Sequence, residues 1–280
     1  MKRAILLGFV FMLVVVFSAC SQGETPQGQS AATHGTEYNS EADFEVKIID
    51  DGEGIEIVKY VGKRQDVRIP PTIQNMPVTS IGDRAFRDGA IGDKPFERKY
   101  LTSVTIPHGV TSIGEWAFSG NKLTSATIPD SVTFIGGSAF ENNKLTSVII
   151  PPGLTVINRR IFMNNQLTDV TIPYGVKSIE HAAFGKNQLI SVTIPPGVTY
   201  ICNGAFRQNH LTSIVIPDGV RSINILAFTN NRLTSITLGA NVRLGDGTFP
   251  AFSNGFDKHY EKNERRKGTY AYGNRQWGME

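Results

Sequence analysis

Two cysteines and five histidines are the residues of this 280-residue chain whose types most often act as nucleophiles, general bases or metal ligands. The histidines lie at unrelated places without the spacing of a zinc site, at His34, His108, His181, His210 and His259. The sequence has neither a phosphate-binding loop nor a GxSxG nucleophile turn. We therefore expect a protein that is not an enzyme and has no metal or cofactor. The alternative is a site assembled from distant parts of the chain.

The first cysteine, Cys20, ends a segment with the features of an export signal. Lys2 and Arg3 are followed by an apolar run over residues 4–16 and then by Phe17-Ser18-Ala19. Because the run is shorter than the roughly 20 residues that cross a bilayer, we predict a cleaved signal. A retained anchor helix is the second interpretation. The formal charge of +3 includes Lys2 and Arg3, so the mature chain is close to neutral, and no polyanionic partner follows from its net charge.

The Ser18-Ala19-Cys20 sequence resembles a bacterial lipobox, in which the cysteine becomes the lipidated first residue of the mature protein. We expect a signal peptide over residues 1–19, lipidation of Cys20, and a flexible tether over residues 20–42, which has few large apolar side chains. The resemblance implies an exported protein anchored by lipid to the cell envelope, at the outer membrane, the surface or the periplasmic face. An ordinary signal with an incidental cysteine would instead give a secreted protein. We expect Cys202 to be a free thiol packed inside the fold.

Most of the chain is an internal repeat of 22 residues, marked by a leucine at the first position of each copy. Apolar residues occupy positions 1, 4, 6, 10, 13, 17 and 18, and a proline follows at position 7 in most copies. One copy cannot bury these side chains alone, so the copies must stack as the coils of a solenoid. The leucines are Leu101, Leu123, Leu145, Leu167, Leu189, Leu211 and Leu233.

The first six positions of each copy predict a short strand, because Thr and Val are frequent there and apolar positions 4 and 6 alternate with positions 3 and 5. The proline at position 7 cannot donate a backbone hydrogen bond and ends the strand. Stacked coils would place these strands side by side in one parallel sheet, about 4.8 Å apart. Each large apolar side chain that becomes fully buried then contributes about 1.5 to 3 kcal/mol.

An asparagine also recurs with the 22-residue period, two positions before each following leucine. One interpretation is a row of ligands on the surface. We favour the other, in which each side-chain amide hydrogen-bonds backbone groups that the corner of a coil leaves unpaired. The asparagines are Asn121, Asn143, Asn165, Asn187, Asn209 and Asn231.

The repeated unit LxxVxIPxxVxxIGxxAFxxN resembles the BspA-like leucine-rich-repeat family, the type found in treponemal surface proteins, from about Val67 to Phe249. The resemblance implies a repeat solenoid, a right-handed leucine-rich-repeat horseshoe with a parallel β-sheet on its concave face and little α-helix. It also implies binding of other proteins, since several members of the family are regarded as adhesins or host-interaction proteins.

The two ends and two irregular places interrupt the period. Residues 43–75 alternate apolar and polar side chains around an Asp-Gly-Glu-Gly turn and predict an N-terminal β-hairpin cap. The leucine-rich-repeat solenoid follows over residues 76–245, and a C-terminal cap over residues 246–280. Ten residues inserted after Phe86 form either a solvated loop or a partner contact. The third full copy has Asn158-Arg159-Arg160-Ile161-Phe162 in place of Gly-x-x-Ala-Phe, which we interpret as tolerated drift.

If positions 4 and 6 point inward, positions 3 and 5 line the concave face with small, polar side chains. Such a row can hydrogen-bond a partner's backbone, although Ser and Thr are also ordinary solvent-facing strand residues. The candidate protein contacts are Thr105, Thr127, Asp169, Thr171, Tyr174, Thr193 and Thr237. Position 12 is apolar in three copies, and this row is either a contact or partly buried. Its members are Phe134, Val156 and Tyr200.

These features predict a non-catalytic cell-envelope protein that binds another protein through its solenoid. The family resemblance suggests an adhesin whose partner is a host extracellular-matrix or cell-surface protein. The alternative is a periplasmic or surface scaffold, a structural lipoprotein that associates with itself. Export, near-neutral charge and the lack of a basic stripe on the strands argue against nucleic acid. We expect contact with a membrane only through an N-terminal lipid.

Overall fold

The computed structural model describes most of the chain as one unit that begins at Glu37. The predicted signal peptide, Cys20 and most of the predicted tether lie outside the described residues, and so does most of the segment inserted after Phe86. The described ranges are 37–49, 52–87, 100–245, 248–249, 256–273 and 276–279.

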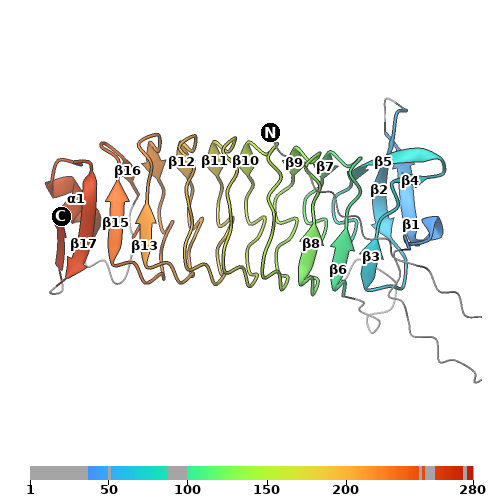
Figure 1. Cartoon of the computed structure of the whole chain (residues 1–280), viewed down its shortest axis with the longest axis horizontal. Helices are drawn as coiled ribbons and strands as arrows, with labels where there is room; N and C mark the ends of the chain where they lie inside the picture. The colour runs from blue at the N-terminus through green and yellow to red at the C-terminus, as the bar shows by residue number, and fades with distance from the viewer. Residues whose placement is uncertain are drawn as a thin grey trace, which may run out of the picture. The chain divides into compact units, whose positions relative to one another are not determined.

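Within that unit, the 22-residue copies form the coils of a β-solenoid, as their period predicted (Figure 1). A coil carries a first strand at positions 3 to 5, a second strand at positions 12 and 13, or both, and strands of one kind pair in parallel between coils. Helical structure in the described residues consists of α1 (Phe256–Lys262) and the 3-10 turn η1 (Glu41–Asp43). The predicted fold class, a solenoid with parallel sheets and little helix, is confirmed.

The first strands show the expected alternation of buried and outward-facing side chains. They are β3 (Asp66–Arg68), β6 (Ser103–Thr105), β8 (Ser125–Thr127), β13 (Ser213–Val215) and β15 (Ser235–Leu238). In β6, for example, Val104 is buried while Thr105 is exposed. The strands pair in two groups, β3 with β6 and β8, and β13 with β15. In the described coils between these groups, the ladder is reduced to one bridge from Thr171 to Thr193.

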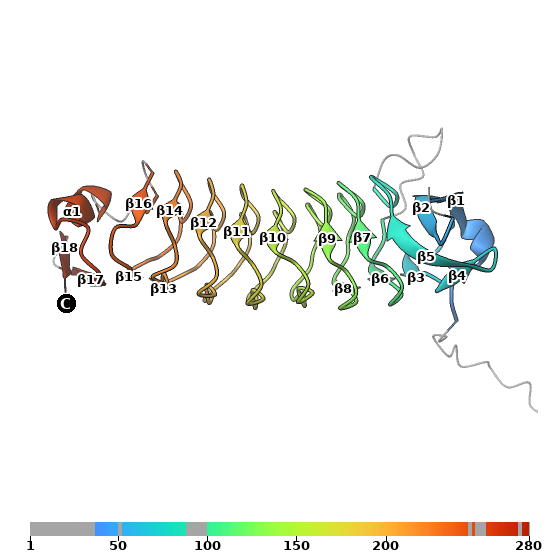
Figure 2. The same cartoon turned by 90° about the horizontal axis from the view of Figure 1, so that it is seen from above.

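A second row of strands runs along the solenoid, which the repeat pattern did not predict (Figure 2). These strands are β5 (Met76–Ile81), β7 (Ser112–Ile113), β9 (Phe134–Ile135), β10 (Val156–Ile157), β11 (Ser178–Ile179), β12 (Tyr200–Ile201), β14 (Ser222–Ile223) and β16 (Arg243–Leu244). Position 13 points into the core and position 12 points outward, so two residues are enough for a pleat. A Cβ on Gly114 at position 14 would lie 2.5 Å from the backbone nitrogen of Asp83 in the preceding coil, so glycine permits this close approach.

The second-strand sheet is interrupted between β9 and β10, where the third full copy departs from the repeat pattern. In the neighbouring coils the residue at position 14 donates its backbone N–H to the preceding coil, as Gly136 does to Ile113 O at 2.7 Å. At the break the Asn158 side chain makes this bond instead, from Nδ2 to Ile135 O at 2.7 Å. Because β8 also ends its group, both sheets stop at the coil of residues 123–144.

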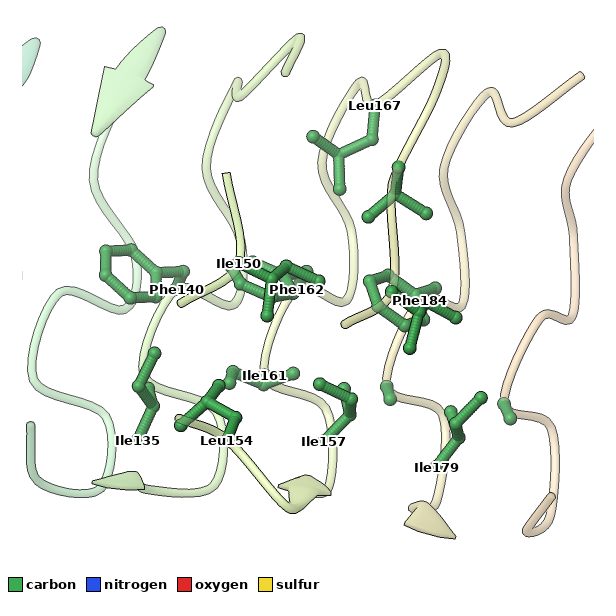
Figure 3. Close-up of a cluster of buried hydrophobic side chains, with 14 of the residues drawn as sticks. Ile135, Phe140, Ile150, Leu154, Ile157, Ile161, Phe162, Leu167, Ile179 and Phe184 are labelled. Atoms are coloured by element: carbon green, nitrogen blue, oxygen red, sulfur yellow. The ribbon is translucent and has the colours of Figure 1, made fainter. Parts of the chain in front are cut away.

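The core is a column of equivalent side chains, one from each coil. The phenylalanine rings at position 18 lie 4.8 to 5.8 Å apart between centroids, from Phe86 to Phe228, and are nearly parallel. Aliphatic side chains from positions 6, 10 and 13 surround the rings, as Figure 3 shows for Ile150, Leu154 and Ile157. This column excludes water along the whole stack and accounts for the strict apolar period.

The periodic asparagines are buried at the corner of each coil. Asn165 Oδ1 accepts a hydrogen bond from Leu145 N at 3.0 Å, and its Nδ2 donates to Phe140 O at 2.9 Å and Phe162 O at 3.2 Å. The same three bonds recur around the other five asparagines. Each amide therefore joins the two ends of its own copy and the preceding copy, which confirms the structural interpretation of this series.

The N-terminal end carries the predicted β-hairpin. Its strands are β1 (Phe44–Ile48) and β2 (Ile55–Tyr60), which pair antiparallel, while β4 (Thr72–Ile73) pairs antiparallel with β5. Because β2 pairs in parallel with β5, the hairpin continues the second-strand sheet of the coils. Tyr60 stacks on Phe86, with 5.4 Å between the ring centroids, and so extends the aromatic column.

The packed unit begins earlier than the sequence predicted. Asn39 is buried, and its Oδ1 accepts a hydrogen bond from Arg68 N at 2.8 Å. Asn39 Nδ2 also donates to Asp43 at 2.9 Å. The boundary of the flexible tether, predicted at residue 42, is therefore too late, because Asn39 already finds partners in the solenoid.

The C-terminal end closes the column with aromatic side chains. After α1, β17 (Gly268–Gly273) pairs antiparallel with β15 and with β18 (Gln276–Met279). Phe256 of α1 packs edge-on against Phe249, with 5.1 Å between the ring centroids. Within the described residues, none of the helices has the length and apolar content that crossing a membrane requires.

Candidate binding surface

The candidate contacts on the first strands differ in how open they are to solvent. The exposed ones are Thr105, Thr127, Asp169, Thr171 and Thr193. Thr237 is half-buried instead, because β17 lies against β15 and the Thr237 hydroxyl shares a hydrogen bond of 2.9 Å with Thr269. We call the outward side of positions 3 to 8 the first-strand face. Its open part ends before Thr237.

Two large apolar side chains stand out on the first-strand face. Tyr174 is 82% exposed and Ile149 is 78% exposed, more than any other large apolar side chain described. They border a shallow hollow of about 490 Å³. Its lining consists of Val148, Ile149, Ile150, Pro152, Thr171, Pro173, Tyr174 and Gly175. The hollow is therefore an apolar depression without a charged side chain, on a face that otherwise presents hydroxyl groups.

The hollow joins positions that lie apart in the repeat. Ile149 is at position 5 of one copy, and Tyr174 is at position 8 of the next. Stacking of the two coils also brings in Thr171, so two predicted contacts, Thr171 and Tyr174, share this site. Ile149 was not among the predicted contacts. The signal was present, because Ile149 replaces a threonine that five of the seven copies have at position 5.

The apolar row at position 12 lies on the other sheet. Phe134, Val156 and Tyr200 are 51%, 36% and 48% exposed, on β9, β10 and β12. The row is not continuous, because Ser178 of β11 separates Val156 from Tyr200 and the sheet is broken between β9 and β10. These side chains are therefore separate half-exposed groups that do not border the hollow at Tyr174.

The second cysteine offers little nucleophilic chemistry. Cys202 is half-buried and free. Burial, with the negative charge and hydrogen bond of Glu180, raises the pKa of Cys202 to about 11. The thiol is consequently protonated at neutral pH, and a protonated thiol is a poor nucleophile.

His181 lies close to two arginines. Burial lowers the pKa of His181, and the positive charges of Arg160 and Arg207 lower it further. In the part of the chain that the structure describes, no three His, Cys, Asp or Glu side chains gather into a group that could hold a metal ion. The absence of catalysis stays a prediction.

Known proteins share both the repeat and the fold. The family model for the BspA type leucine rich repeat region matches in six copies, over residues 89–210 and 177–274. The crystal structure of the T. pallidum leucine rich repeat protein TpLRR is 25% identical, with a TM-score of 0.53, over 83% of this chain and 98% of that chain. A leucine rich cell surface protein from Faecalibacterium prausnitzii is 26% identical, with a TM-score of 0.58, over 89% of this chain and 62% of that chain. No curated protein matches the sequence.

Proposed function

Because this chain belongs to the BspA type leucine-rich-repeat family, we propose that it is a non-catalytic protein of the cell envelope that binds another protein through its first-strand face. Leucine-rich-repeat solenoids are suited to protein interaction, since their coils present an extended surface. The observation that carries the proposal is the apolar hollow between Ile149 and Tyr174.

The hollow has the make-up of a binding hot spot. A few aromatic anchors in pockets dominate the energy of protein interfaces, and Tyr174 is such an anchor beside Ile149. Covering apolar surface of this kind contributes about 25 cal/mol per Å². The exposed Asp169 lies two residues before Thr171, and the exposed Thr193 forms a bridge with Thr171 from the next coil. These two side chains supply a polar rim that can hydrogen-bond a partner's backbone.

The proposed place of action is the cell surface, with anchorage through a lipid on Cys20. The partner we propose is a host extracellular-matrix or cell-surface protein. Support comes from the signal-like sequence that ends at Cys20 and from the F. prausnitzii relative, which is described as a cell surface protein.

A binding assay on immobilised extracellular-matrix proteins, with serum albumin as the control surface, tests this function. The unaltered chain is expected to bind the matrix saturably. The double variant Ile149→Thr with Tyr174→Ser is expected to bind at least about tenfold more weakly, because it removes both anchors. Tyr200→Ser is the matched control, since it removes a half-exposed tyrosine from the other sheet and is expected to change affinity less than about twofold. Equal weakening in both variants, or equal binding to albumin, contradicts the proposal.

The second candidate function is a scaffold that associates with itself. The half-exposed Phe134 and Tyr200 on the second strands favour this candidate. Sedimentation across a range of concentrations is then expected to show association that Phe134→Ser with Tyr200→Ser abolishes. Protease digestion of intact cells tests the location: digestion supports a surface protein, whereas protection until the outer membrane is opened contradicts an adhesin and favours a periplasmic scaffold.

A further inference from the structure

Charge is unevenly distributed around the coils, although the whole chain is close to neutral. Over residues 101–232, positions 1 to 13 of the copies carry two basic and three acidic side chains. Positions 14 to 22, together with residues 82–87 of the preceding coil, carry nine basic and four acidic side chains. The basic ones are Arg84, Arg87, Lys122, Lys144, Arg159, Arg160, Lys186, Arg207 and Arg232. One side of the solenoid is therefore basic in spite of the balanced total.

Three arginines of this side surround a single tryptophan. The Cζ atoms of Arg84, Arg159 and Arg87 lie 4.7, 5.6 and 6.0 Å from the centroid of the Trp116 ring. A guanidinium over an indole face is attracted by the ring, so Trp116 holds the three positive charges together. The ring is thereby covered by arginine and does not act as an exposed apolar anchor.

Arg159 reaches this tryptophan across an intervening coil. The intervening residue is Gly137, where a Cβ would lie 2.8 Å from Arg159 Cγ, so a larger residue would obstruct the side chain. Arg159 Nη2 then pairs with Glu115 Oε2 at 3.0 Å. The third copy therefore does more than drift from the repeat, because Arg159 makes defined contacts two coils away.

The basic side continues along the stack through Arg160, which follows Arg159 in the same coil, and Arg207, which lies two coils further on. Arg160 is exposed. Arg207 Nε is buried and has no hydrogen-bond partner among the described residues. Burial lowers the pKa of His181, and the positive charges of Arg160 and Arg207 lower it further, so both arginines lie close to this histidine. Among the described residues, neither arginine forms an ion pair that would neutralise it.

We name Arg84, Arg87, Arg159, Arg160 and Arg207 the arginine strip, and we propose that it binds a linear anionic polysaccharide. Arginine binds sulfate-like and carboxylate groups through a planar fork of N–H donors. The strip arginines come from the coils of Phe86, Phe162 and Phe206, which lie three and then two coils apart, and each coil adds the 4.8 to 5.8 Å between successive core rings. The positive charges are therefore spread along the length of the stack, as a linear polymer with charges along its chain requires.

The chemistry around the arginine strip favours a polysaccharide over an acidic protein. Exposed amides at position 20 lie beside it, and Asn164 Nδ2 donates to Asn142 Oδ1 at 2.8 Å. Amides can both donate to and accept from sugar hydroxyls. Protein partners rely on apolar anchors, and the two most exposed ones, Tyr174 and Ile149, belong to the first-strand face. Ile225 and Leu226, one coil beyond Arg207, mark the apolar end of the basic side.

Binding of the purified chain to immobilised heparin, a sulfated polysaccharide, tests the proposal. The double variant Arg160→Glu with Arg207→Glu is expected to bind at least about tenfold more weakly at physiological salt. The matched control is Lys177→Glu with Arg221→Glu, which changes the net charge by the same amount at exposed positions of the other side. The control is expected to bind within about twofold of the unaltered chain. Unchanged binding by the first variant, or equal weakening of both, overturns the proposal.

Two further measurements keep the test decisive. Arg160→Gln with Arg207→Gln introduces no new negative charge and is expected to weaken binding in the same direction while the chain melts at an unchanged temperature. Competition with hyaluronan, which has carboxylates only, shows whether sulfate is required, and either result supports a polysaccharide if poly-L-glutamate competes poorly. Poly-L-glutamate that competes as well as heparin contradicts the polysaccharide and indicates an acidic protein segment.

Discussion

The buried and the exposed positions of the coils share one 22-residue period. Residue types recur in successive copies at the buried positions, whereas they vary more at the exposed positions. Inside, the phenylalanine column and the asparagine series hold it in successive coils from Phe118 to Asn231. A missing ring would leave a cavity, and a missing amide would leave buried backbone groups unpaired. Outside, Ile149 replaces the usual threonine of position 5, and position 15, where Arg159 lies, differs from copy to copy, while the column is unbroken. The period therefore marks what stability requires, and both proposed binding surfaces contain residues that do not follow it.

Removing one ring from the column tests this contrast most strongly. Phe162→Ala is expected to lower the free energy of unfolding by about 3 to 5 kcal/mol, because Phe162 is fully buried between two other rings. Urea denaturation followed by circular dichroism measures the change. Phe134→Ala is the matched control on the surface and is expected to cost less than about 1.5 kcal/mol. A similar loss in both variants would show that the column has no special role.

Removing one amide from the asparagine series has the next largest effect. Asn165→Ala is expected to lower the free energy of unfolding by about 2 to 3 kcal/mol, because Leu145 N and Phe140 O lose a buried partner. The exposed neighbour provides the control, since Gln166→Ala is expected to stay within about 0.5 kcal/mol of the unaltered chain. The comparison fails if Asn165→Ala is as stable as Gln166→Ala in the same denaturation series.

Cys202 is half-buried at the surface of the core. The alkylation rate of its thiol therefore measures how well the folded coils shield this position from solvent. With a pKa of about 11, the folded thiol is expected to react with iodoacetamide at pH 8 about 10²-fold more slowly than an unfolded thiol. Folding favours the protonated form, so this contribution to stability is complete below the unfolded pKa of about 8.5 and is lost as pH rises towards 11. Equal alkylation rates with and without urea would contradict this shielding.

The smallest effect is expected for the surface contact that crosses a coil. Gly137→Ala obstructs the path of Arg159, and Glu115→Gln removes its carboxylate partner. Each is expected to cost less than about 1 kcal/mol, because exposed ion pairs contribute little. A double-mutant cycle in thermal melts checks that the two act on one contact. Fully additive effects would show that Gly137 and Glu115 do not act through the same arginine.

The column could be predicted because one residue type repeats at one position. The first strands were predicted for every copy, but the copies that begin at Leu145, Leu167 and Leu189 form none among the described residues and keep only the bridge from Thr171 to Thr193. The second strands could not be predicted, because two residues such as Ser112 and Ile113 form too short a pattern to show alternation. Their pairing depends on neighbouring coils, as the break beside Asn158 shows. The second strands form because neighbouring coils pair with one another, and the sequence of a single copy does not indicate this pairing.

The candidate site could be predicted only in part, for a similar reason. Tyr174 and Thr171 were identified from their positions in the copies. Ile149 was missed although it replaces the usual threonine of position 5, because the sequence does not show that it lies beside Tyr174 of the next coil. Arg159 was interpreted as drift, since nothing in one copy indicates a tryptophan two coils away. Contacts within one position of the repeat are visible in the sequence, whereas contacts between different positions of stacked coils require the structure.

The coincident end of both sheets at residues 123–144 has a mechanical consequence. Across this junction the strands contribute no ladder in the described coils, while the turn side keeps its backbone bonds, such as Ser138 N to Arg159 O at 2.8 Å. The turn side of the junction therefore resists bending, whereas the strand side, which has no ladder in the described coils, bends more easily. When force is applied to one end of the solenoid, bending is expected to begin at this junction. The hollow at Tyr174 lies in the coils directly after the junction.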